Sequence, residues 1–143
     1  MEKVIDRAFL DALWHQASES PRLRMNFDMR NSALDTSQRM LNALQPGTVV
    51  PIHRHENTDE TVICLCGRLE EIIYEEVIEY ERVLTFGGED VVRKSSFKEL
   101  SRQQLCPADG IYGMQIPSGT WHSINVIEPS VIFEAKDGKY EGG

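Results

Sequence analysis

Two of the four histidines lie two residues apart in GTVVPIHRHENTDETVICLCG, residues 47–67. His53 and His55 follow a β-branched run, and Glu60 comes after the turn-like ENTD. Alternate residues of a strand share a face. Both imidazoles should therefore project to one side, and Glu60 can join them across the turn. Burying three such polar groups is costly unless they are paired. Neutral imidazoles and a carboxylate are typical ligands of divalent transition metals, so the pattern predicts a metal site.

A fourth ligand should come from elsewhere in the chain. His122 follows Pro117–Ser118–Gly119–Thr120, a predicted turn, and begins the next predicted strand. His15 lies in a predicted helix and is not expected to be a ligand. A single histidine is more often a satisfied core or surface residue, so the prediction depends on the His-x-His spacing together with His122.

The rest of the sequence predicts the elements that position these residues. Residues 3–18 place Ile5, Phe9 and Leu13 on one helical stripe, and Pro21 ends this helix. RLRMNFDM, residues 22–29, alternates apolar and polar residues like a half-buried strand. Further short strands are expected at 38–44, 49–55, 60–66, 68–74, 77–84, 112–117, 121–127 and 131–135. The polar segment 85–103 is expected to be an excursion between strands, with a helical turn near residues 95–101. Together these elements predict an all-β barrel or sandwich with a short N-terminal helix.

Composition excludes several classes of partner. The 143 residues favour one domain. The net charge of -8 argues against binding to nucleic acid or to anionic membranes, and no apolar run approaches the roughly 20 residues that span a bilayer. MEKVIDRAFLDALWH does not read as a signal peptide. Cys64, Cys66 and Cys106 form no CxxC pair. We therefore expect buried free thiols and a cytoplasmic location.

The metal-site residues resemble the two motifs of the cupin superfamily. The spacing of the first motif is matched by Gly47, His53, His55, Glu60 and Gly67. PSGTWH, residues 117–122, resembles the centre of the second motif. That motif has a glycine where Ile111 stands, and an asparagine four residues after its histidine, whereas Asn125 comes three after His122. The resemblance implies a double-stranded β-helix (jelly-roll) barrel with one divalent metal held by His53, His55, Glu60 and His122.

A wider match covers RMNFDMRNS, QRMLNAL and HRHENTDET, and it resembles the WbuC family of cupin-fold metalloproteins. That family is often associated with bacterial surface-polysaccharide (O-antigen) gene clusters. The resemblance implies a single cupin domain over residues 1–143, with a helix in 1–20, the barrel in 22–136 and a loose tail in 137–143. With strand parity, it also suggests substrate-binding residues for a carbohydrate-like ligand: Asn26, Arg39 and Gln115.

Three functions are compatible with these residues. We favour a metal-dependent enzyme acting on a sugar or sugar-linked intermediate, as an isomerase, epimerase or dioxygenase. The alternatives are a metal-dependent sugar-binding protein without turnover and a metal-free structural cupin. Zn, Fe, Ni, Mn and Co all suit the ligand set, and the sequence shows no separate acid–base pair. We also expect a homodimer, in which the leading helix and strand 22–29 cover a sheet edge or exchange between copies.

Overall fold

The computed structural model describes residues 2–138, so most of the expected loose tail, residues 139–143, lies outside the described part. Helix α1 spans Arg7–Glu19 and begins later than predicted because the Asp6 side chain caps it, accepting a hydrogen bond of 2.9 Å from the Phe9 N–H. Leu13 and Ala17 are buried on its inner face. They pack against Leu41, Ala43 and Val131 of the sheet, so the helix covers one end of the barrel wall.

The strands confirm an all-β jelly roll with one N-terminal helix. They are β1 Arg24–Asp28, β2 Ser37–Leu44, β3 Glu60–Thr85, β4 Gly88–Leu105, β5 Gly113–Ile116 and β6 Trp121–Asp137, with a short 3-10 helix, η1, at Pro107–Asp109. Neighbouring strands follow the order β1-β2-β6-β3-β4, β5 pairs with β3, and every pairing is antiparallel. No helix of the described residues is long and apolar enough to cross a membrane.

Strands β3 and β6 wrap the barrel because both are long and both change register. β6 pairs with β2 through residues 130–137 and with β3 along most of its length. The β3–β6 register shifts between Cys64 and Cys66, and twice more before Leu69. Gly67 sits in this irregular stretch with a φ of 93°, and a Cβ added there would collide with the Pro129 carbonyl and with Ser130. The glycine of the first motif is therefore required by close packing of two backbones.

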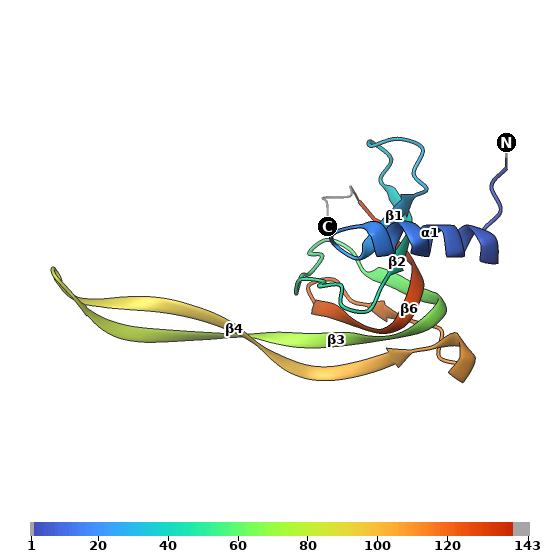
Figure 1. Ribbon diagram of the computed structural model, residues 1–143. Helices are drawn as coiled ribbons and strands as arrows, with labels where there is room; N and C mark the ends of the chain where they lie inside the picture. The colour runs from blue at the N-terminus through green and yellow to red at the C-terminus, as the bar shows by residue number, and fades with distance from the viewer. Residues whose placement is uncertain (1, 139–143) are drawn as a thin grey trace.

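The predicted strands 60–66, 68–74 and 77–84 form the single strand β3, and 121–127 and 131–135 form the single strand β6. Two further predictions are wrong. Residues 49–55 form no strand, and only His53 makes an isolated bridge, with His122. The helical turn predicted near residues 95–101 is wrong, because the whole of 88–105 is strand β4. β4 pairs with β3 from Leu69 to Thr85 and builds a long two-stranded hairpin that projects from the barrel (Figure 1). Hydrophobic alternation did not reveal this strand, because residues 88–103 are exposed and pack against no core.

The three cysteines are free, and Cys64 and Cys106 are buried. Burial raises the pKa of the Cys64 thiol to about 12. A thiol with that pKa is protonated at neutral pH and is a poor nucleophile. Cys64 therefore contributes to packing rather than to nucleophilic chemistry.

Candidate metal centre

Backbone hydrogen bonds bring the two cupin-like motifs together. The N–H of His53 donates to the His122 carbonyl at 3.0 Å, and the N–H of His122 donates back to His53 at 2.9 Å. The Gly119 N–H also donates to the His55 carbonyl at 2.7 Å. These bonds fix the irregular 48–59 segment against the start of β6. The His-x-His pair is therefore positioned by a bridge, and not by the strand that its alternation predicted.

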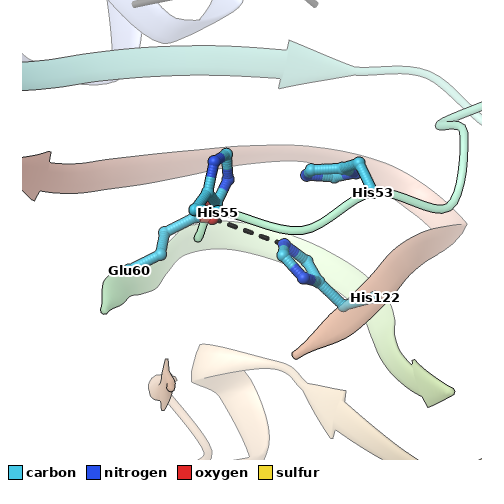
Figure 2. Close-up of side chains that lie close together, drawn as sticks. All are labelled: His53, His55, Glu60 and His122. Atoms are coloured by element: carbon cyan, nitrogen blue, oxygen red, sulfur yellow. Dashed lines mark ion pairs between the residues drawn. The ribbon is translucent and has the colours of Figure 1, made fainter. Parts of the chain in front are cut away.

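The four predicted ligands converge on one point (Figure 2). The candidate ligand atoms of His53, His55, Glu60 and His122 all lie within 4.8 Å of one another. Glu60 Oε2 lies 2.8 Å from His55 Nε2 and 3.4 Å from His122 Nε2. Ligand atoms that share one ion at about 2.1 Å lie roughly 3–4 Å apart. The cluster therefore needs only a small contraction to hold a metal.

Contacts between ring Nδ1 atoms and backbone carbonyls orient two of the imidazoles for metal binding. Nδ1 of His53 lies 2.8 Å from the Pro51 carbonyl, and Nδ1 of His122 lies 2.9 Å from the Thr120 carbonyl. A carbonyl accepts, so each Nδ1 carries the proton and each Nε2 keeps a lone pair. His122 Nε2 is buried and has no hydrogen-bond partner among residues 2–138. Buried lone pairs that face a carboxylate repel one another unless a cation lies among them, so the residues fit a divalent metal.

The electrostatics agree with this interpretation. Burial opposes ionisation of Glu60, but the nearby His122 and His55 rings outweigh it and hold the Glu60 pKa well below its usual range. Burial, followed by the neighbouring His122 ring, lowers the pKa of His53. A carboxylate that stays ionised and an imidazole that stays neutral are the protonation states that a metal requires.

The cluster lines a cavity of about 280 Å³, and polar or charged residues outnumber the apolar ones, Met40, Val50, Pro51 and Ile124, around it. Asn26, Gln38 and Asn42 line it, as do the cations Arg24 and Lys136. The Oε1 of Gln38 and the Oδ1 of Asn42 are buried without a hydrogen-bond partner in the described structure. These amide oxygens are acceptors available to a ligand that donates hydrogen bonds.

Two carboxyl groups in the same cavity, the buried Glu71 and the half-buried Glu134, were missed by sequence reasoning. Both oxygens of Glu71 are buried and have no hydrogen-bond partner among the described residues. Burial, followed by the charges of Glu60 and Glu134, raises the Glu71 pKa well above its usual value. Burial and the charge of Glu60 also raise the pKa of Glu134, which accepts a hydrogen bond from Asn42 at 3.3 Å. The one available signal was an acidic residue inside each apolar run, LEEIIY and VIFEAK.

The structure places the three predicted substrate residues in different surroundings. Asn26 lines the cavity beside the metal cluster. Arg39 points to the other face of β2, where it pairs with Asp35 at 3.2 Å, and it does not line the cavity. Gln115 is exposed on β5, also outside the cavity lining. Their roles in substrate binding stay predictions. His15 lies exposed on α1, away from the cluster.

Two comparisons concern the sequence of the chain. A family model described as "Domain of unknown function (DUF6016)" matches residues 5–84, more than half of the chain. No curated protein shows significant sequence similarity to the chain.

Among solved structures, KdgF from Halomonas sp. matches with a TM-score of 0.55 and 15% identity, over 85% of each chain. A conserved protein of unknown function from Streptococcus pyogenes, SPY1581, matches with a TM-score of 0.54 and 12% identity, over 99% of this chain and 91% of that one. Oxalate oxidase in complex with the substrate analogue glycolate matches at 0.54 and 13%, over 87% of this chain but only 56% of the oxidase. At these identities the likeness shows the cupin fold alone.

Proposed function

We propose that this protein, which belongs to the family described as "Domain of unknown function (DUF6016)", is a metal-dependent cupin-fold enzyme acting on a small polyhydroxylated molecule. The observation that carries the proposal is the convergence of His53, His55, Glu60 and His122 in the wall of a polar cavity. Three imidazoles and one carboxylate leave coordination positions for a substrate. A divalent ion held there would supply Lewis acidity to a substrate oxygen, and Zn, Fe, Ni, Mn and Co all remain candidates.

The cavity supports a small ligand rich in hydroxyl groups. Its volume of about 280 Å³ lies at the lower end of ligand pockets, at roughly the space of nine water molecules. Unpartnered acceptors at Gln38, Asn42 and Glu71 would each be satisfied by a hydroxyl donor. Leaving such groups buried and unpaired costs free energy, so a polyol or sugar suits the wall better than an apolar ligand does. Arg24 and Lys136 offer positive charge to an anionic group on the same ligand.

The finer assignment is a role of WbuC type in surface-polysaccharide (O-antigen) biosynthesis. It rests on the resemblance of RMNFDMRNS, QRMLNAL and HRHENTDET to the WbuC family. The cavity adds support, because its lining side chains include acceptors that can bind hydroxyl groups. The three free cysteines are compatible with a reducing compartment, and we place the reaction in the cytoplasm.

One observation favours proton transfer over dioxygenation. Glu71 is buried in the cavity wall with a raised pKa, and this shift favours the protonated form of its carboxyl group. A protonated carboxyl group can give its proton to a substrate that a bound metal would polarise, and the carboxylate that remains can then take a proton back. Isomerisation or epimerisation of a sugar requires such an exchange beside a carbonyl carbon. The missing acid–base group of the sequence is therefore supplied by Glu71.

Metal analysis followed by exchange in heavy water tests the proposal. We expect about one transition-metal ion per purified chain. The metal-loaded protein, mixed with a panel of sugars, sugar phosphates and nucleotide sugars in D₂O, should place deuterium beside the carbonyl carbon of one of them, as seen by proton NMR. Chelated protein should not do so. Glu71→Gln should keep its metal and lose the exchange, because an amide carries no transferable proton.

The other outcomes identify the alternatives. Binding of a sugar by calorimetry without conversion would indicate a non-catalytic binding protein. Oxygen consumption without deuterium exchange would indicate a dioxygenase. A chain that takes up no transition metal at all would refute the proposal and leave a structural cupin.

A further inference from the structure

The β3–β4 hairpin extends well beyond the barrel. We define the arm as residues 74–99, the part of this hairpin outside the barrel. β6 pairs with β3 only as far as Tyr74, and beyond that point β3 and β4 pair only with each other within residues 2–138. Twelve cross-strand pairs, from Tyr74–Glu99 to Thr85–Gly88, give the arm a length of about 36 Å. Figure 1 shows it projecting away from every other element. An isolated two-stranded hairpin is only marginally stable in water, so this one needs a covering surface.

One face of the arm is markedly more apolar than the other. Cross-strand register places one set of side chains on a single face: Tyr74, Glu76, Ile78, Tyr80, Arg82 and Leu84 of β3, and Glu89, Val91, Arg93, Ser95, Phe97 and Glu99 of β4. All aromatic residues of the two arm strands lie on this face. Leu84 is 90% exposed, Tyr80 70% and Val91 64%. The opposite face pairs Glu75 with Lys98 and Glu79 with Lys94. Such one-sided exposure marks an interaction surface.

We propose that the apolar face of the arm docks against the same face of a second copy of this chain, with the two arms antiparallel about a two-fold axis. The sequence of the arm is complementary to itself in this arrangement. When the axis passes level with Glu79, residues of β3 equally far from position 79 lie opposite each other. Ile78 then faces Tyr80 of the second copy, and Glu76 faces Arg82 of the second copy. A two-fold interface requires this kind of self-complementarity.

Strand β4 obeys the same alignment. Its register with β3 places Phe97 opposite Val91 of the second copy, and Arg93 opposite Ser95. The only like-charge pair on this face, Glu89 with Glu99, lies where Arg102 already neutralises Glu99 at 2.8 Å. The fully exposed Phe86 at the tip would reach the base of the other arm, where the Phe97 and Trp121 rings are 4.9 Å apart. Apolar pairs thus alternate with polar or charged pairs along the arm.

Helix α1 and strand β1 are less suited to this role, although the sequence pointed to them. The apolar side of α1 is already buried within its own chain, where Leu13 and Ala17 contact the sheet. The arm is the larger uncovered apolar feature among the described residues, so we place the dimer interface there.

Light scattering of paired variants tests the interface. The full chain should be a dimer at micromolar concentration. Ile78→Lys combined with Tyr80→Lys should make it monomeric, because four lysines would meet at the axis. Val92→Lys is the matched control: Val92 is 40% exposed on the opposite face, so this variant should stay dimeric. Metal content and circular dichroism should be unchanged in both variants, which separates loss of the dimer from loss of the fold.

Cysteine cross-linking tests the alignment of the arms. A mixture of Ile78→Cys chains and Tyr80→Cys chains should form an intermolecular disulfide at least several-fold faster than either variant alone, because position 78 faces position 80 and not itself. A monomeric full chain would overturn the proposal. A dimer that survives the double lysine variant, or equal cross-linking in all three samples, would overturn the arm interface. Neither result would bear on the metal centre.

Discussion

Replacing Glu71 by Gln should stabilise the metal-free protein, and the gain should grow with pH. The side chain is 0% exposed, and both carboxyl oxygens lack a hydrogen-bond partner among residues 2–138. Burial, with the charges of Glu60 and Glu134, raises the pKa of the folded state well above that of the unfolded chain. The buried Glu71 therefore lowers the stability of the folded, metal-free protein.

The sign follows from proton binding. Above the unfolded pKa of about 4.3, the unfolded chain releases the Glu71 proton while the folded chain keeps it. The folded state then binds more protons, so its stability falls as pH rises through the raised pKa. The slope reaches up to about 1.4 kcal/mol per pH unit. Glu71→Gln removes that slope, so the advantage of the variant should widen as the pH rises from 5 towards 8, and each kcal/mol of it should raise Tm by about 4 °C.

Urea denaturation of chelated protein at four pH values between 5 and 8 measures the effect. Glu75→Gln is the matched control, because Glu75 is exposed on the same strand and its substitution should leave the pH dependence unchanged. Adding Zn²⁺ should narrow the difference between Glu71→Gln and wild type, because a nearby cation favours the ionised carboxylate. Parallel stability curves for wild type and Glu71→Gln across this range would refute the assignment of a raised pKa to Glu71.

Three further outcomes are expected. His53→Ala should lower the bound metal measured by elemental analysis at least tenfold, whereas His15→Ala, on the exposed side of α1, should leave it unchanged; equal stoichiometry in both would remove His53 from the ligand set. Metal occupancy should fall as pH drops through about 6.5, the usual imidazole range, because protons compete for the ring nitrogens; occupancy that is constant from pH 8 to pH 5 would contradict this. Gly67→Ala should lower the free energy of unfolding by about 3 kcal/mol or more, because Gly67 has a φ of 93° and an added Cβ would collide with the backbone. Gly87→Ala, with no atom within 4 Å of the added Cβ, should be nearly neutral in the same denaturation experiment. Similar losses of stability at the two glycines would count against the packing role of Gly67.

The candidate metal ligands could be proposed from the sequence because the pattern that suggests them is local. Two histidines with one residue between them, a short turn and a carboxylate define a cluster whatever the rest of the chain does. His122 could be added because the turn before it, residues 117–120, resembles the centre of the second cupin motif. The structure retains this cluster even though residues 49–55 form no strand. The bridge from His53 to His122 orients the ring as a strand would have done.

The faces of β3 could not be read from the sequence beyond its first residues. Glu60, Val62 and Cys64 point inward at even positions, whereas Leu69 and Glu71 point inward at odd positions. The register shifts between residues 64 and 69 exchange the two faces, because one extra residue reverses the direction of every side chain that follows. A parity argument from Glu60 therefore places Glu71 outside the barrel, whereas the structure places it in the cavity.

The arm shows a second limit of prediction from the sequence. Hydrophobic alternation predicts a strand only where one face packs on a core. Strand β4 from residue 88 to residue 103 is exposed and polar, and its partner residues in β3 set its course. The sequence by itself determined the β-rich class, the leading helix and the four candidate ligands, because each follows from residues close together in the chain. Only the tertiary structure decided which carboxyl groups enter the cavity and where the hairpin leaves the barrel, because both depend on backbone pairings between distant residues.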